Sequence, residues 1–282
     1  MKSIIFSLEK NLSFLYKAKL RVKMLKHGTS VHFRKPESVD PSSIPKETLL
    51  CTDALSLYKK VKASGAEALI FAHTESDIDG FSEGKYFVLD AKNAEYDYFL
   101  KVYKRINNIP WEILKTKRLI IRETVEPDVD EFAKIYADPE ITRYTDPLYP
   151  DVNEEKRYVT EYREKVYAVQ GFGIWTVLLK DGTVIGRAGL TVRSDFEDVE
   201  TGFVIGTKWQ NKGYGTEAVK AVTEHAFKLG FPKVNALVIP ENVRSVRVLE
   251  KCGYMPHDKI MLEKREYMVY SVSDNYDRIH TE

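Results

Sequence analysis

The sequence has little cysteine: two residues in 282, Cys51 and Cys252, which lie far apart. They provide neither the closely spaced ligands of a structural zinc site nor a disulfide framework. We therefore expect a reducing compartment, with the cytoplasm as the default location, and two free thiols in the protein core. The six histidines show no paired ligand spacing either, so no metal site is predicted.

A long apolar run and an excess of one charge are also missing. No segment approaches the roughly 20 apolar residues that cross a bilayer, and residues 1–16 include Glu9 and Lys10 without a cleavage-like pattern. Neither a membrane partner nor a signal peptide is predicted. The 43 basic and 42 acidic residues give a net charge of +1, so no global field indicates nucleic acid. The composition, 43% hydrophobic and 30% charged, is that of a globular protein of about two domains.

The first part of the chain is locally basic and hard to assign. Residues 1–47 contain ten Lys and Arg against four Asp and Glu. This excess could attract an acidic partner, although a solvated face is the simpler expectation. Leu8, Leu12 and Leu15 have helical spacing, whereas Leu20 to Met24 alternate with charged residues as in a strand. Helix and strand both remain open for this segment.

Residues 48–103 predict a small parallel sheet. Residues 48–52 form an apolar strand, residues 55–65 a helix that ends at Gly65, and residues 66–72 a second strand. Strand, helix and strand with short turns make a parallel crossover unit. Asp53 could be catalytic at the carboxyl end of its strand, but capping the helix is the preferred interpretation. The segment faintly resembles half a haloacid-dehalogenase-like sheet, but it lacks that family's paired Asp-x-Asp, so its chemistry is not carried over.

A domain boundary is predicted where Asn107 to Pro110 break a helix that starts near Glu95. The expected domains are therefore residues 1–110 and 111–282. In the second domain, the patterns predict strands at 118–122, 173–177, 183–192, 203–205, 234–238 and 266–272. They also predict helices at 127–136, 154–169, 216–230 and 242–251.

One stretch of the second domain has the pattern of an anion site. Phe203 to Ile205 form a strand, Gln210 to Gly215 a glycine-containing turn, and Thr216 is placed to cap the next helix. The free N–H groups of such a turn and the positive end of the helix converge where a pyrophosphate can sit. The spacing is neither the three-glycine dinucleotide fingerprint nor a Walker loop.

Gln-x-x-Gly-x-Gly at 210–215 resembles the acetyl-CoA loop of the GNAT superfamily of N-acetyltransferases. Two further segments support this resemblance. Residues 116–123 (TKRLIIRE) look like the first strand of the ribosomal-protein acetyltransferase subgroup, and residues 242–254 are similar to the family's Asn-x-x-Ser…Glu-Lys-x-Gly-aromatic helix. The resemblance covers residues 116–273. It implies a mixed, mostly antiparallel sheet in this domain. Together with the small parallel α/β domain that the residue pattern predicts before it, the expected fold class of the chain is α/β (α+β).

The resemblance implies how acetyl-CoA is held. The strand Phe203, Val204 and Ile205 would splay from its neighbour and pair with the pantetheine arm. An N–H of Val204 or Ile205 would bind the thioester oxygen, as an oxyanion-type donor does. Asn242 would bind the pantetheine amide, or cap its helix, or do both. The pyrophosphate would lie on the turn formed by Gln210, Asn211, Lys212, Gly213, Tyr214, Gly215 and Thr216.

The implied reaction is direct attack of an amine on acetyl-CoA, which requires a base for the ammonium. Glu200 is the candidate base, with Glu197 or Asp198 as substitutes. The family's usual tyrosine acid is replaced by Leu249, so Ser245 or water would protonate the thiolate.

The acceptor would be a small-molecule or protein amine in a pocket lined by Tyr144, Tyr149 and Trp175, and a homodimer is possible. Two rival functions remain open: a non-catalytic acyl-CoA sensor, or a hydrolase-like or partner-binding role of residues 1–110.

Overall fold

The computed structural model describes residues 1–74, 78–89, 94–193, 198–262 and 264–274. The chain divides into two compact units, Met1–Trp111 and Glu112–Glu282. This division falls one residue after the boundary expected from Asn107 to Pro110. None of the helices in the described ranges is long and apolar enough to cross a membrane.

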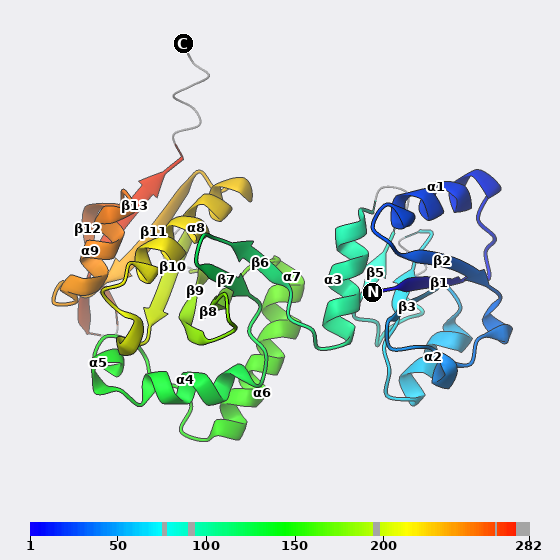
Figure 1. Ribbon diagram of the computed structural model, residues 1–282, viewed down its shortest axis with the longest axis horizontal. Coiled ribbons are helices and arrows are strands. Elements are labelled where there is room, and N and C mark those ends of the chain that lie inside the picture. Colours follow the sequence, from blue (N-terminus) through cyan, green and yellow to red (C-terminus); the bar gives the residue numbers. More distant parts are fainter. Residues whose placement is uncertain (75–77, 90–93, 194–197, 263, 275–282) are drawn as a thin grey trace, which may run out of the picture. The chain divides into compact units, whose positions relative to one another are not determined.

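The N-terminal unit contains a five-stranded parallel sheet with the strand order β2-β1-β3-β4-β5 (Figure 1). Its central strands are short apolar runs that are almost entirely buried, as parallel strands covered on both faces usually are. The strands are β1 (Ser3–Ser7), β2 (Ser30–Arg34), β3 (Thr48–Thr52), β4 (Leu69–Phe71) and β5 (Phe87–Val88).

Helices cover both faces of this sheet: α1 (Phe14–Leu25) and α3 (Tyr96–Ile106) pack on one face, and α2 (Leu55–Ala63) on the other. The segment left open by the sequence is therefore a helix, and Ser13 caps it. The expected cap of α2 is wrong. Ala54 occupies that position, no side chain caps the helix, and Asp53 bonds elsewhere.

The C-terminal unit is built on an eight-stranded mixed sheet, β12-β13-β11-β10-β9-β8-β7-β6, in which only β10 and β11 pair in parallel. This confirms the expected α/β architecture with a mostly antiparallel sheet. The strands are β6 (Glu112–Lys115), β7 (Leu119–Arg122), β8 (Ile174–Leu179), β9 (Val184–Val192), β10 (Val199–Ile205), β11 (Lys233–Val238), β12 (Met255–Leu262) and β13 (Arg265–Ser273).

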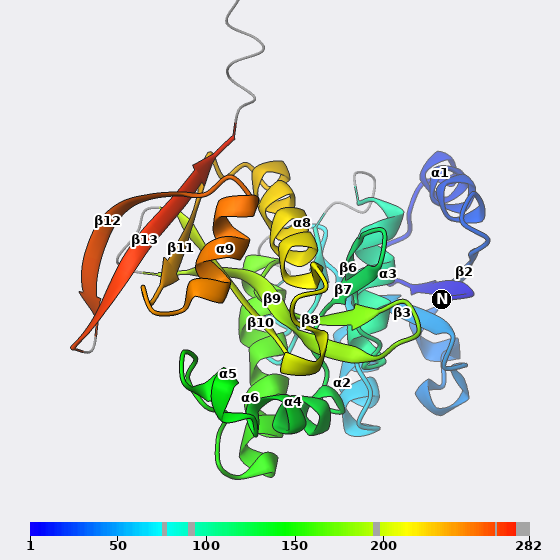
Figure 2. The same ribbon diagram turned by 60° about the vertical axis from the view of Figure 1, so that its left-hand side comes forward.

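Two layers of helices cover this sheet. Apolar residues of α8 (Tyr214–Lys228) join the larger core on one face, and α4 (Asp128–Tyr136) packs in a separate core on the other. Figure 2 shows α8 beside α9 (Val243–Lys251), over β10 and β11. The remaining helices are α5 (Pro139–Thr142), α6 (Val152–Tyr162), which continues as one π turn, and α7 (Ala168–Gln170).

The two central strands separate, and this creates the site. β10 pairs with β9 at seven positions, from Val199 to Ile205. It pairs with β11 only at Val199 and Glu200, after which the two strands diverge. The carboxyl half of β10 therefore has one edge without a neighbouring strand, directly before the turn that leads into α8.

Candidate active site

The turn after β10 leads into α8 with its backbone donors uncapped. Asn211 and Gly213 have φ values of +58° and +80°, so the chain makes a left-handed bend that a glycine adopts without strain. The helix begins at Tyr214 with Gly213 at the cap position and no side-chain cap. The expectation that Thr216 caps α8 is wrong, because Thr216 lies in its first turn. The N–H groups of that turn have no partner within the helix.

A clamp from the turn between β6 and β7 supports the turn before α8. The Arg118 Nε donates to Glu217 Oε2 at 2.6 Å, and its Nη1 donates to the Lys212 carbonyl at 2.8 Å. The same guanidinium lies 4.5 Å from the centre of the Tyr214 ring. Thr116 Oγ1 and the Arg118 N–H also donate to Glu217. Contacts between the β6–β7 turn and Glu217 of α8 therefore fix the geometry of this turn.

The pKa of Glu217 reflects this clamp. Burial acts to raise it, but the hydrogen bonds from Thr116 and Arg118 outweigh burial and hold the pKa below its usual value. Glu217 is thus a carboxylate at neutral pH. Two residues expected in the phosphate loop, Lys212 and Tyr214, are not among those that line the adjacent cavity; the Tyr214 ring lies against Arg118 instead.

The open edge of β10 presents alternate backbone groups. The Gly206 N–H donates to a carbonyl of β9 at 2.9 Å. Because successive strand residues turn their backbone groups to opposite edges, Val204 also faces β9 and Ile205 faces the gap. The Gln210 Nε2 reaches the Ile205 carbonyl at 2.8 Å, which agrees with this direction. Of the two expected thioester donors, only Ile205 faces the gap, so the expectation for the N–H of Val204 is wrong.

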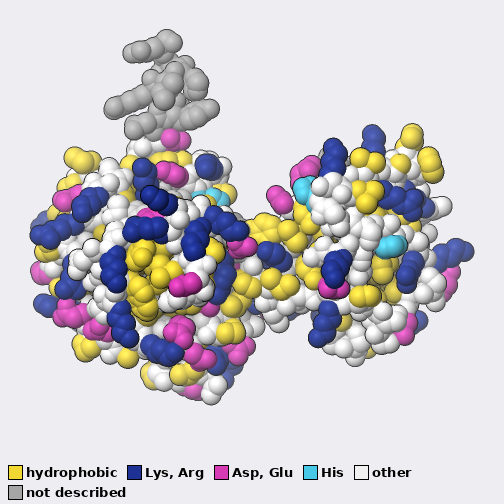
Figure 3. All heavy atoms as spheres, in the orientation of Figure 1, with side chains coloured by type: hydrophobic (Ala, Val, Ile, Leu, Met, Phe, Trp, Pro, Cys, Tyr) yellow, Lys and Arg dark blue, Asp and Glu magenta, His cyan; other side chains and the backbone are white. Residues whose placement is uncertain are grey.

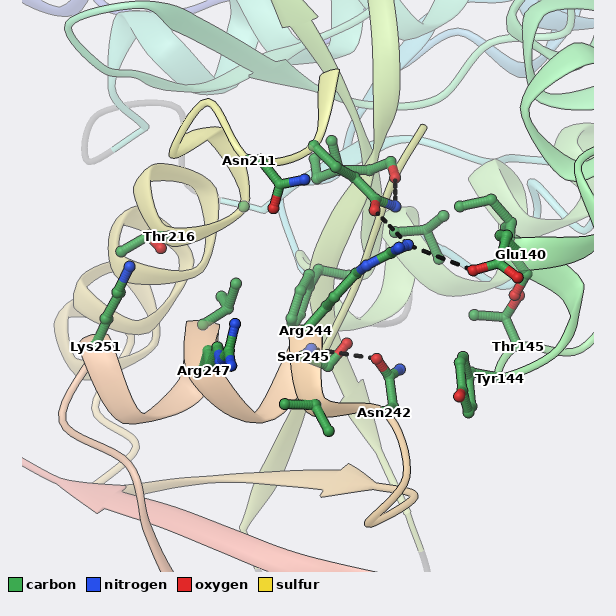
Figure 4. Close-up of a pocket in the computed structure, with 18 of the residues that line it drawn as sticks. Glu140, Tyr144, Thr145, Asn211, Thr216, Asn242, Arg244, Ser245, Arg247 and Lys251 are labelled. Carbon is green, nitrogen blue, oxygen red and sulfur yellow. Dashed lines mark hydrogen bonds and ion pairs between the residues drawn. The ribbon is translucent and has the colours of Figure 1, made fainter. Parts of the chain in front are cut away.

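A cavity of about 440 Å³ lies against this edge (Figure 4). Its lining brings together most of the residues predicted to hold the cofactor: Phe203, Val204, Ile205, Gln210, Asn211, Gly213, Gly215, Thr216, Asn242 and Ser245. On the face of the C-terminal unit seen in Figure 3, apolar side chains lie in the middle and Lys and Arg side chains surround them.

Three cations of α9 also line this cavity, and the sequence analysis missed them. Arg244, Arg247 and Lys251 lie three or four positions apart, so they share one helix face. The Arg244 Nη1 contacts Gln210 Oε1 at 3.1 Å and Glu140 Oε2 at 3.6 Å. Their spacing in the sequence was the signal that could have identified this basic face.

The start of α9 places Asn242 and Ser245 at the inner end of the cavity. Asn242 caps the helix, and its Oδ1 accepts the Ser245 N–H at 3.2 Å. The capping alternative for Asn242 is therefore confirmed, while its amide group still lines the cavity. Figure 4 shows both side chains on the side of Tyr144.

A second cavity, of about 890 Å³, adjoins the first. Both cavities share the side chains of Tyr144, Thr145, Phe203, Val204, Asn242 and Ser245. Tyr149 lines the second cavity, as expected. Trp175 does not: it is fully buried in the core against His225, so that assignment is wrong.

Glycine makes room for the second cavity. Gly202 lines it and pairs in register with Gly189 of β9. A Cβ on Gly202 would meet only Ile174 Cδ1, at 3.6 Å, so the space over β10 is open there. Two positions earlier on the same face lies Glu200, whose carboxylate is 3.4 Å from the Arg193 Nε.

Among the described residues that line the second cavity, the charges are balanced. Three carboxylates, Asp146, Glu155 and Glu200, line it together with three guanidinium groups. Among these, Arg187 lies 4.8 Å from the centre of the Phe132 ring. Of the alternative bases, Asp198 pairs with Lys233 at 3.0 Å, whereas Glu197 lies outside the described residues. Among the described residues, no group of three or more His, Cys, Asp or Glu side chains is placed to hold a metal ion.

Comparisons with known proteins agree with this geometry. Residues 118–255 match the model of the acetyltransferase (GNAT) domain. An uncharacterized N-acetyltransferase p20 of Bacillus licheniformis is 25% identical over 146 residues, which are 51% of this chain and 82% of that protein. The ribosomal protein uS5-alanine N-acetyltransferase of Escherichia coli is 27% identical over 158 residues, 52% of this chain and 80% of that protein.

The fold has the same relatives. The crystal structure of a ribosomal-protein-S5-alanine acetyltransferase from Vibrio fischeri superposes with a TM-score of 0.51 at 16% identity, over 58% of this chain and 97% of that one. The splayed strands, the uncapped turn and the matched domain together identify the C-terminal unit. The C-terminal unit is a GNAT acetyltransferase domain, a family that uses acetyl-CoA.

Proposed function

We propose that this protein transfers the acetyl group of acetyl-CoA directly to a primary amine while both are bound. The observation that carries this proposal is the junction of the two cavities at Val204, Asn242 and Ser245. A thioester that enters from the first cavity and an amine that enters from the second would meet at this junction. Holding two reactants in this way replaces a bimolecular encounter with a step inside one complex.

The first cavity suits the cofactor from its diphosphate to its thioester. The N–H groups at the start of α8 would hold the pyrophosphate, and Arg244, Arg247 and Lys251 would add positive charge beside it. The pantetheine arm would run along the open edge of β10. There the Ile205 N–H would donate to the thioester oxygen, which gains negative charge during attack. One such donor typically lowers a barrier by about 3 kcal/mol.

The chemistry needs one base and one proton donor. Glu200 would remove a proton from the ammonium, through water, so that the amine nitrogen can attack the thioester carbon. The attacking nitrogen becomes cationic; as the carbon–sulfur bond breaks, it loses a second proton to water, and the thiolate of CoA takes a proton, so the protons balance. Leu249 lines the second cavity but has no acidic proton. Ser245 or water would therefore supply the proton for the thiolate.

The balanced charges of the second cavity favour an acceptor with a single primary amine. In the described part of the lining, three guanidinium groups match the three carboxylates, so these residues offer a polyamine or an aminoglycoside no net negative charge. A small monoamine or a peptide amino terminus fits this lining better. The Escherichia coli relative is named for a protein alanine acceptor, which agrees with the peptide alternative.

The test is release of CoA from acetyl-CoA by the full-length chain, with a panel of monoamines, peptides and polyamines. We expect release with a monoamine or a peptide. The Glu200→Gln variant should lower kcat by about 100-fold, mainly at low pH, where most of the amine is protonated. A wild-type pH profile in this variant would remove Glu200 from the mechanism.

A second candidate function is a non-catalytic acyl-CoA sensor, and the leucine at position 249 favours it. Leu249 is buried and cannot protonate a thiolate. A sensor would bind acetyl-CoA with normal affinity but release no CoA with any amine in the panel. The same assay, combined with a binding titration, therefore separates the two functions.

A further inference from the structure

Helix α1 of the N-terminal unit has two opposite apolar faces. Tyr16, Leu20 and Met24 point into the core and are buried. On the other side, four large apolar residues are exposed to solvent: Phe14 by 82%, Leu15 by 72%, Val22 by 57% and Leu25 by 61%. At about 100° per residue, these four fall within one arc of roughly 100° along the outer face. We call them the outer stripe of α1.

Cations flank the outer stripe on both sides. Helical spacing places Lys17 and Arg21 on one flank and Lys19 and Lys26 on the other, while Lys23 pairs with Glu95 at 3.1 Å. Residues 14–26 contain no acidic residue. Figure 3 shows apolar and basic side chains together at the place where the ribbon of Figure 1 has α1. The local basic excess seen in the sequence is thus gathered around an exposed apolar face.

We propose that the outer stripe docks on an anionic lipid surface. A helix with a central apolar face and cations on both flanks lies in the plane of a membrane. Its apolar residues enter the acyl boundary, and its cations meet the headgroups. The long Lys and Arg stems reach sideways to that level. The stripe is convex and lies on a helix of 12 residues, so it rests on the surface and does not span the bilayer.

Charge argues against a second copy of this chain as the occupant. Two α1 helices packed on their outer stripes would bring like charges together without one acidic residue on either helix. The sequence-based expectation of no membrane partner rested on the absence of a spanning run, which says nothing about a helix that lies on the surface.

The test is sedimentation of the full-length protein with vesicles. Vesicles of equal parts phosphatidylglycerol and phosphatidylcholine should bind the protein, and vesicles of pure phosphatidylcholine should bind it much more weakly. Binding should fall as salt is added. Equal binding to both kinds of vesicle, or no binding to either, would overturn the proposal. In the second case an acidic protein partner becomes the occupant to examine.

Matched variants locate the contact. Val22→Ser should weaken binding by about ten-fold. Val169→Ser, in the C-terminal unit and even more exposed (78% against 57%), should not. Reversing Lys19 and Lys26 to Glu should weaken it by at least roughly 25-fold. The same reversal of Lys59 and Lys60 on α2 controls for net charge. Equal effects of test and control variants would contradict docking through α1.

Discussion

Backbone N–H groups cluster at the end of a strand in both units, but only one cluster is left open. After β1, the N–H groups of Glu9 and Lys10 donate to the Asp53 carboxylate at 2.6 and 3.0 Å, and His73 approaches it to 2.8 Å. At the start of α8, no side chain caps the N–H groups beside the first cavity. The comparison indicates that a cluster of backbone N–H groups is available to an external ligand only where no carboxylate of the protein itself occupies it.

Sheet pairing explains why the two clusters differ. β1 and β3 stay paired in parallel to their ends, with Ser7 opposite Thr52, so Asp53 follows directly beside the loop after β1. In the C-terminal unit, β11 leaves β10 after Glu200, and glycines at 213 and 215 carry no side chain into the turn. The N–H groups of the open cluster therefore remain available to an external anion.

The first and largest expected effect comes from making the open cluster resemble the closed one. Gly215→Glu places a carboxylate beside the uncapped N–H groups, where it would repel the diphosphate. We expect acetyl-CoA binding to weaken by at least about 100-fold in a calorimetric titration. Gly215→Ala is the control, because a Cβ there meets its nearest atom, in Val248, at an ordinary 3.5 Å. Unchanged affinity in a folded Glu variant would refute the loop assignment.

The converse change empties the closed cluster. Asp53→Ala leaves two backbone donors and His73 without their shared carboxylate, whose side chain is only 6% exposed. We expect the free energy of unfolding to fall by about 2–3 kcal/mol, measured by urea unfolding. Asp40→Ala, which removes an exposed carboxylate that also accepts a backbone N–H, is the control and should change stability little. Equal losses in both variants would mean that Asp53 does not hold the loop.

A smaller effect is expected from loosening the support of the open cluster. Arg118→Ala removes the bonds to Glu217 and to the Lys212 carbonyl. The turn should then lose its fixed geometry, and the Kd for acetyl-CoA should rise by about ten-fold. Glu217→Gln should act in the same direction. If the affinity stays unchanged in Arg118→Ala, the clamp has no part in cofactor binding.

The clamp also predicts a pH dependence. Because the pKa of Glu217 is lowered in the folded protein, its carboxylate stabilises the turn above the unfolded pKa of about 4.3. That contribution is lost as the pH falls through the lowered folded pKa. Between neutral pH and a pH of about 5, Glu217 should therefore stay ionised and contribute equally to acetyl-CoA affinity. The ratio of the Kd values of wild type and Glu217→Gln should then be constant over this range.

The smallest effect is expected at the junction of the two cavities. Ser245→Ala removes a hydroxyl while leaving the N–H that bonds to Asn242. If water can also protonate the thiolate, kcat should fall by only about three- to ten-fold with KM for acetyl-CoA unchanged. A rise in KM alone would assign Ser245 to cofactor binding instead.

The sequence predicted what depends on local spacing. The conformations of the turn from Gln210 to Gly215 and of the helix capped by Asn242 depend on a few neighbouring residues, and both segments line the first cavity. Features that depend on the register of the sheet could not be predicted from local sequence spacing. The direction of the Val204 N–H and the burial of Trp175 follow from which strands pair and which face each residue takes.

Contacts between distant segments explain the other misses. Asp53 has the local sequence pattern of a helix cap. Its carboxylate instead accepts two hydrogen bonds from N–H groups of the loop after β1. β12 was not predicted because most of its residues are exposed and it pairs only with β13. The Arg118–Glu217 contact joins residues 99 positions apart, so no local sequence pattern predicts it.

The most direct test follows the amide signals of both clusters in one experiment. Acetyl-CoA is titrated into ¹⁵N-labelled full-length protein, and the amide resonances of both turns are recorded. The account predicts large shifts at Tyr214, Gly215 and Thr216 and none at Glu9 and Lys10. Shifts at Glu9 and Lys10 with an unaffected α8 turn would contradict it.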